Sequence, residues 1–332
     1  MMSDQQKCSI TDCHAPDKSR EVRLGLVMYG GVSLAIYING VAHEFFRAVR
    51  GRGVYKLIKA LTDSDIVVDV ISGTSAGGIN GILLAYALCN KKDFSSCANL
   101  WRIDGDIRSL LRPPTYEVVP TQSLFDSEGY YQERLEAAFR EMPEYIPEEH
   151  EIDSSFAELD LFVTGTDVDG NIYTQLDDAG HQIDLKDHRS VFHLKHRHGR
   201  KEPFKTDRSA GQYVSTETTF RALAKLARIT SCFPAAFCPV HVSDDRLGDA
   251  SVDGKLQTWG NLGKDSYFLD GGVIVNKPFT YTIIEIFYRA ADRQVERKLF
   301  YVEPDPERFT QQEIASCPNF LQAIIASLIG IP

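Results

Sequence analysis

The pattern of hydrophobic and polar positions shows two similar units near the N-terminus. Residues 22–29 form a short apolar run that stops at Gly30-Gly31, and residues 34–49 are compatible with a helix. The same order returns further along, where residues 66–71 are typical of a strand and residues 79–89 are apolar enough for a buried helix. Two units of strand, small-residue turn and helix predict a parallel sheet.

The rest of the chain continues the alternation of strands and helices. The candidate strands are residues 159–167, 267–269 and 299–302, and the candidate helices between them are residues 130–141, 217–229 and 278–291. We therefore predict an α/β fold of three layers, in which helices cover both faces of a mostly parallel central sheet.

We expect a single domain, because no flexible linker interrupts this alternation. Its predicted bounds are residues 21–305, after a polar, disordered leader over residues 1–20. An apolar helical segment, residues 306–332, is expected to pack on further sequence or on a partner. Within the domain, the proline-containing segment 111–129 is predicted to be a loop or cap, and the charged, histidine-rich segment 184–208 an exposed hairpin.

Composition and charge exclude several classes of protein. A formal net charge of -10 argues against a nucleic-acid-binding protein, because phosphate contacts need a clustered basic surface. The seven cysteines have no metal-like spacing, and their odd number suits a reducing compartment such as the cytoplasm. The leader lacks the apolar stretch of a secretory signal, and no run approaches the roughly 20 apolar residues of a membrane-spanning helix. Any membrane contact is therefore expected to be peripheral.

The first candidate for chemistry is Ser75. It lies in a G-x-S-x-G pattern with Gly73 and Gly77, between a predicted strand and a predicted helix. In this setting the pattern predicts a nucleophile elbow, in which small neighbours let strand and helix approach closely while the serine is held in a strained conformation. The alternative is a tight strand-to-helix turn without a catalytic role.

The first glycine turn is the natural candidate for an oxyanion hole. The backbone N–H groups of Gly30, Gly31 and Val32 leave a strand and enter a helix, so they can converge on one point without side chains in the way. One alternative is a glycine pair needed only for packing. A dinucleotide-binding loop is disfavoured because the G-x-G-x-x-G spacing is absent.

A serine nucleophile also needs a base. No histidine follows His241, so a triad in the α/β-hydrolase order would need an earlier acid such as Asp167. Asp270, followed by Gly271 and Gly272, instead puts a carboxylate at the end of a predicted strand, where the loops of α/β sheets build sites. Taken alone, the same residues are also typical of an Asx turn that closes a strand.

Together these residues resemble the patatin-like phospholipases in order and approximate spacing, from Gly30-Gly31 through Ser75 to Asp270. The proline-containing segment 231–237 also resembles this family, and the similarity covers residues 22 to about 304. It is closest to bacterial members whose first loop reads Gly-Gly-Val-Ser-Leu-Ala, as residues 30–35 do here. Many members have a third glycine and a basic residue in this loop, where this chain has Val32 and Leu34.

The resemblance implies a lipid acyl hydrolase that acts at a membrane surface without a metal or organic cofactor. Ser75 would attack an ester carbonyl, Asp270 would accept its proton, and water would clear the acyl-enzyme. An ordinary aspartate is a weak base, so partial burial is expected to raise the pKa of Asp270. Two alternatives stay open: a histidine-dependent carboxylesterase of the α/β-hydrolase type that uses His241, and a catalytically inactive module that binds lipid or a partner.

The histidine-rich segment raises the question of a metal site. Its four histidines match no established ligand spacing, and strand alternation divides them between two faces. We therefore expect a solvated hairpin, with a basic contact to anionic lipid as the second alternative and no metal. The residues concerned are His188, His193, His196 and His198.

Overall fold

Seven strands form one sheet in the part of the chain that the computed structural model describes, which is residues 18–31, 35–112, 123–147, 158–197, 203–204, 216–245 and 250–303. The strand order is β5-β6-β3-β2-β1-β7, and β4 pairs with β3 in addition. The central strands β7, β1, β2 and β3 run parallel to one another. The strands are β1 (Arg20–Met28), β2 (Ser64–Gly73), β3 (Glu158–Leu176), β4 (Gln182–Arg197), β5 (Val240–Val242), β6 (Ser266–Asp270) and β7 (Gln294–Val302).

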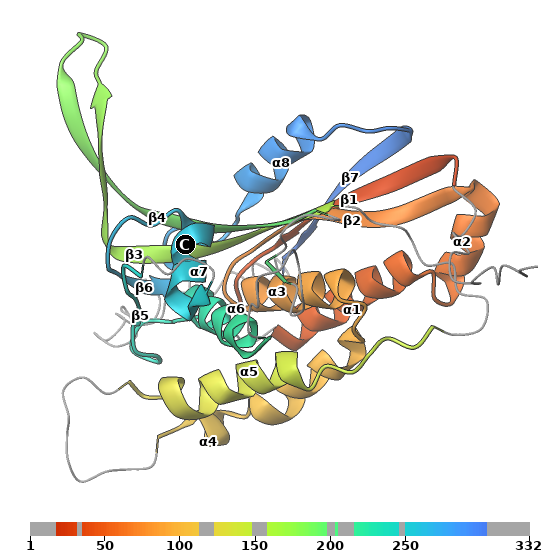
Figure 1. Cartoon of the computed structure of the whole chain (residues 1–332), viewed down its shortest axis with the longest axis horizontal. Helices are drawn as coiled ribbons and strands as arrows, with labels where there is room; N and C mark the ends of the chain where they lie inside the picture. Colours follow the sequence, from red (N-terminus) through yellow and green to blue (C-terminus); the bar gives the residue numbers. More distant parts are fainter. Residues whose placement is uncertain are drawn as a thin grey trace, which may run out of the picture.

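Helices cover both faces of the sheet, as predicted (Figure 1). On one face α8 (Phe279–Tyr288) packs against β1 and β2. On the other face α1 (Ala35–Arg50), α3 (Ala76–Cys89) and α6 (Thr216–Thr230) lie side by side, and α5 (Gln132–Arg140) packs on the outer side of α6. The remaining helices are α2 (Val54–Thr62), α4 (Ile107–Leu110), α7 (Val252–Gly260) and the short η2 (Phe94–Cys97), η3 (Leu100–Asp104), η4 (Ser127–Tyr131) and η6 (Gly271–Val273).

The second strand and the helix that follows it form the centre of the core. All ten residues of β2 are buried, as is typical of a strand covered on both faces. In α3 every residue from Ala76 to Leu88 is buried, because the helix is apolar on all sides and packs between α1, α6 and the sheet. The turn between β2 and α3 is thus held by two rigid, buried elements.

β3 organises the part of the sheet that leads to the site. Its residues 160–163 pair with the end of β2 in parallel, and its residues 165–167 pair with β6 in the antiparallel sense. β4 pairs with β3 along residues 158–166 and occupies its other edge. β2 and β6 therefore lie along the same edge of β3, and their carboxyl ends face each other across a single intervening position, Thr164.

The exposed hairpin predicted at residues 184–208 requires a correction. The hairpin is longer and begins earlier, since its strands are β3 and β4 and its turn lies near residues 177–181. Only its distal half projects from the body of the molecule (Figure 1). The later residues of β4 belong to the sheet, where Phe192 and Leu194 are buried and the intervening His193 lies on the other face. Residues 198–202 and 205–208 lie outside the described part.

The short elements that were not predicted are α2, α4, α7, β5, η2, η3 and η6. Two predicted segments fall partly outside the described residues, namely 1–17 of the leader and 113–122 of the proline-containing segment. The C-terminal segment 306–332 lies wholly outside them. Of the leader, Ser19 donates a hydrogen bond to Asp63 and Arg20 opens β1. None of the described helices is long and apolar enough to cross a membrane.

Candidate active site

Ser75 occupies a strained turn between β2 and α3. Its φ of 53° lies in the left-handed region that non-glycine residues rarely adopt. Two hydrogen bonds hold this conformation, because Ser75 donates its backbone N–H to Thr230 Oγ1 at 2.9 Å and its carbonyl accepts the N–H of Ile79 at 2.9 Å. The side chain makes no capping hydrogen bond to the helix that begins at the next residue, as expected for the predicted nucleophile elbow.

The two glycines of the G-x-S-x-G pattern are required by close backbone approach. A Cβ atom at Gly73 would lie 2.6 Å from the carbonyl oxygen of Gly77. A Cβ atom at Gly77 would lie 2.5 Å from the carbonyl carbon of Met28, at the end of β1. Because both neighbours are backbone, neither clash can be relieved by moving a side chain, and the elbow depends on glycine at both positions.

Asp270 ends β6 and meets Ser75. The Ser75 hydroxyl donates to Asp270 Oδ2 at 2.8 Å, although the two residues are 195 positions apart. Gly272 donates its backbone N–H to Asp270 Oδ1 at 2.7 Å, so both carboxylate oxygens accept a hydrogen bond. Gly271 packs against Thr164 of β3, where a Cβ would lie 2.6 Å from the Thr164 carbonyl carbon. The structure thus brings together the two residues that the sequence analysis proposed as nucleophile and base.

Burial sets the protonation behaviour of Asp270. The residue is 3% exposed, and desolvation disfavours its charged form. This raises the pKa of Asp270 to about 7, despite the opposing effect of the hydrogen bonds from Gly272 and Ser75. None of the described cationic side chains forms an ion pair with it. The expected rise in pKa is confirmed, and Asp270 is a stronger base than an exposed aspartate.

The first glycine turn lies beside Ser75. A Cβ atom at Gly30 would come within 3.1 Å of Ser75 Cβ, which shows how close the loop passes. The Gly30 N–H donates to Asn276 Oδ1 at 3.1 Å. Gly31 ends this described stretch, and Val32 lies outside the described residues together with Leu34. The assignment of the oxyanion donors to Gly30, Gly31 and Val32 stays a prediction.

The alternative base, His241, contacts other residues than the dyad. Its side chain is 42% exposed, lies 3.9 Å from Asp265 and stacks near Tyr267. Asp167 is buried and accepts the backbone N–H of Asp169 at 2.9 Å, and no hydrogen bond or ion pair joins it to His241 among the described residues. The geometry does not support a triad built on His241.

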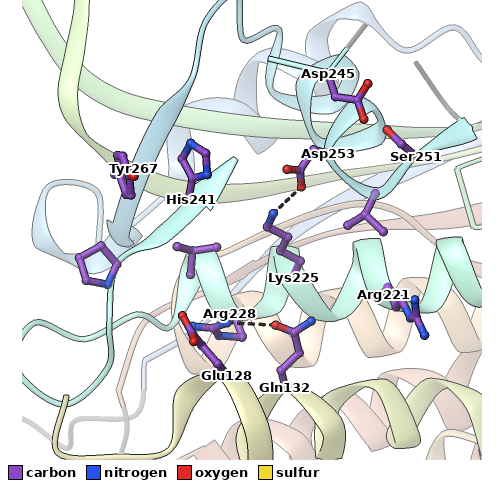
Figure 2. Close-up of a pocket in the computed structure, with 13 residues that line it drawn as sticks. Glu128, Gln132, Arg221, Lys225, Arg228, His241, Asp245, Ser251, Asp253 and Tyr267 are labelled. Carbon is purple, nitrogen blue, oxygen red and sulfur yellow. Dashed lines mark hydrogen bonds and ion pairs between the residues drawn. The ribbon is translucent and has the colours of Figure 1, made fainter. Parts of the chain in front are cut away.

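A separate cavity of about 610 Å³ lies beside α6 and is lined mainly by polar side chains (Figure 2). Lys225 and Arg228 project into it from α6, and His241 and Tyr267 line it from β5 and β6. Arg228 donates to Gln132 Oε1 at 3.0 Å. Neither Ser75 nor Asp270 lines this cavity, so it is distinct from the dyad.

One described group has the atoms of a metal site, formed by Asp160, His193 and Glu285. However, one oxygen of the Asp160 carboxylate accepts from His193 at 2.6 Å, and the other is contacted by Arg197 and Arg289. The charge of the buried carboxylate is thus already balanced by neighbouring cations, and this arrangement favours an ion-pair network over a metal site.

Residues 26–283 match the family model of the patatin-like phospholipases. The chain belongs to this family. It is also 28% identical over 323 residues to the "Uncharacterized membrane protein Rv3479" of Mycobacterium tuberculosis (strain ATCC 25618 / H37Rv). The match covers 86% of this chain and 28% of that relative, so the chain spans little more than a quarter of the relative's length.

Three polar residues of this patatin-like site were missed by sequence reasoning. Thr230 holds the Ser75 backbone, and Asn276 holds Gly30. The Thr74 hydroxyl bonds to Thr164 Oγ1 at 2.7 Å and to the Val275 carbonyl at 2.8 Å, which joins the elbow to β3 and to the loop after β6. A lone threonine or asparagine carries no signal in a single sequence, because its role depends on a partner far along the chain.

The glycine argument can be tested by stability. Gly77→Ala should destabilise the protein by about 1–3 kcal/mol, because the added methyl group meets the fixed backbone of Met28. Gly40→Ala in α1 is the matched control, since a Cβ there meets no atom within 4 Å and alanine favours a helix. Thermal unfolding of both variants checks this. Equal melting temperatures would contradict the close approach.

The burial of Asp270 predicts a pH-dependent cost in stability. The folded pKa of Asp270 is about 7, whereas an unfolded aspartate titrates near 4. The protonated acid therefore makes its full contribution to folding stability below about pH 4, and this contribution is lost as pH rises through about 7. Asp270→Asn should therefore stabilise the protein by about 2–4 kcal/mol at pH 8 and much less at pH 5. Urea unfolding at both pH values checks this, with the exposed Asp265→Asn as control. A loss of stability in Asp270→Asn at pH 8 would be inconsistent with an uncompensated buried carboxylate.

Proposed function

We propose that this patatin-like chain is a serine acyl hydrolase that cleaves ester bonds of phospholipids or related lipids through a Ser75–Asp270 dyad. The observation that carries the proposal is the 2.8 Å hydrogen bond from Ser75 Oγ to a buried carboxylate whose pKa is raised to about 7. A base of that strength can accept a proton from a serine hydroxyl near neutral pH without a histidine.

The reaction proceeds in two halves. Ser75 Oγ attacks the ester carbonyl carbon while its proton passes to Asp270 Oδ2, and the tetrahedral oxyanion is held by amides of the glycine turn at Gly30, Gly31 and Val32. The intermediate collapses as Asp270 returns the proton to the leaving alcohol, which gives an acyl-enzyme on Ser75. Water then attacks the acyl carbon, Asp270 accepts a proton from it, and Ser75 leaves with that proton.

Apolar side chains near the dyad support a lipid substrate. Val273 and Ile274 follow directly on Asp270-Gly271-Gly272 and are 38% and 47% exposed. Ile36 and Tyr37, in the first turn of α1 after the glycine turn, are 48% and 54% exposed. Both segments follow strands at the edge where Ser75 lies, and exposed apolar groups of this kind favour contact with acyl chains. We place the enzyme in the cytoplasm, in peripheral contact with a membrane surface.

The dyad is tested by three substitutions. Ser75→Ala and Asp270→Asn should each reduce hydrolysis of phospholipid vesicles by at least about a thousandfold, because nucleophile and base act as a unit. His241→Ala, which removes the exposed histidine beside Asp265, should retain full activity. Mass spectrometry of released fatty acids measures turnover, and a fluorophosphonate probe should label only variants that keep Ser75. A Ser75→Ala protein with undiminished activity would refute the proposal.

The pKa of Asp270 predicts the pH dependence. Because the base works only when ionised, kcat/KM should fall tenfold per pH unit below about pH 7 and level off above it. Initial rates on a soluble ester across pH 4–9 test this prediction. An acidic limb with an apparent pKa near 4 would mean that Asp270 is not desolvated in the working enzyme.

A further inference from the structure

Asn276 connects the two loops that flank the dyad. It follows Asp270 by six positions, and its Oδ1 accepts the backbone N–H of Gly30 at 3.1 Å. Gly30 belongs to the turn after β1, whereas Asn276 belongs to the loop after β6. A single side chain thus joins the candidate oxyanion loop to the loop that carries the base.

The carboxamide lies inside the site. A Cβ atom at Gly30 would lie 3.1 Å from Ser75 Cβ and 3.5 Å from Asn276 Cγ. A Cβ atom at Gly272 would lie 3.1 Å from Asp270 Oδ1 and 3.2 Å from Asn276 Oδ1. Asn276 Oδ1 therefore lies between the two glycine turns that flank Ser75 and Asp270.

The backbone around Asn276 is fixed to the nucleophile elbow. The Val275 carbonyl accepts the Thr74 hydroxyl at 2.8 Å, and the Pro278 carbonyl accepts the Ser72 hydroxyl at 2.8 Å. Ser72 and Thr74 flank Gly73, immediately before the serine. The loop that carries Asn276 is thereby held against the elbow, and the Asn276 side chain in turn holds Gly30.

A glycine turn needs such an anchor. Without side chains, Gly30 and Gly31 cannot hold their own backbone by packing, and glycine has more conformational freedom to lose than any other residue. Amides of an oxyanion hole act only when they are held in advance at the position where the charge develops. An anchor on Gly30 fixes the starting point of the following amides, beginning with Gly31.

We infer that Asn276 is a positioning residue for the oxyanion loop, which it holds against the Ser75 elbow through the Gly30 N–H. The inference rests on the proposed function. In the resting site the Gly30 N–H is bound by Asn276, so the oxyanion contact proposed for Gly30 requires that N–H to be shared with Asn276. Gly31 is the first amide beyond the anchor. The opposite role is a blocking one. Asn276 Oδ1 would then occupy the Gly30 N–H, a donor that the substrate needs, and would slow the reaction. The two roles predict changes of opposite sign when the side chain is removed.

The test compares Asn276→Ala, Asn276→Asp and Asn90→Ala. Asn276→Ala should lower kcat for a soluble ester by about ten- to a hundredfold with KM nearly unchanged, and should slow fluorophosphonate labelling of Ser75 equally. Asn276→Asp keeps the acceptor for Gly30, so kcat should return at high pH. Its new carboxylate should move the acidic limb of the pH profile up by about one pH unit, because a like charge raises the pKa of Asp270.

Asn90→Ala is the control. It removes an asparagine at the far end of α3, about 20 Å along the helix, and should leave kcat unchanged.

The outcomes separate the inference from the proposed function. If wild type is not labelled by the probe, the proposed function itself fails. If wild type is labelled and Asn276→Ala matches it in kcat and labelling rate, the positioning role is refuted while the dyad stands. A faster Asn276→Ala would assign the blocking role instead. Should Asn276→Ala not fold, Asn276→Asp decides alone, since an unmoved acidic limb would place residue 276 too far from Asp270 to act in the site.

Discussion

The carboxyl ends of β2 and β6 meet along one edge of β3, and the site depends on that meeting. β2 approaches in the parallel sense and β6 in the antiparallel sense, so their last residues face each other across Thr164. Ser75 comes two residues after the end of β2, and Asp270 is the last residue of β6. This explains how residues 195 positions apart share a hydrogen bond. The contacts of Thr164 with Thr74 and with Gly271 fix the spacing between the two ends.

The same meeting buries the carboxylate, and burial gives it a base strength suited to neutral pH. Asp270 receives hydrogen bonds from Ser75 and Gly272 but forms no ion pair with a described cation. A nearby cation would stabilise the charged form and lower its pKa, whereas desolvation raises it. Stability and base strength are therefore opposed at this residue. The fold tolerates the cost because the surrounding strands and helices hold a large apolar core around it.

The sequence predicted the elements whose pattern is local and missed those defined by distant partners. The apolar run of β2, the all-apolar α3 and the glycine pattern around Ser75 are each visible in a few residues. The extension of β3 to Leu176 was not visible, because its distal half is exposed and mainly polar. Thr230 and Asn276 were missed for a related reason: their hydrogen bonds reach 155 and 246 positions along the chain. Periodicity reports burial, but it does not identify partners across the sheet.

The glycine turn also bears on substrate preference. Where many patatin-like proteins carry a basic residue in this loop, this chain has Leu34, and Arg50 at the end of α1 is instead buried against the carbonyls of Ala87 and Leu88, at the far end of α3 from Ser75. A cation within about 6 Å of Asp270 would lower its pKa by one unit or more and weaken the base. None of the described cations forms an ion pair with Asp270, so the described part of the site avoids this loss. The proposed function thus combines two features: burial gives Asp270 its base strength, and apolar contact binds the substrate.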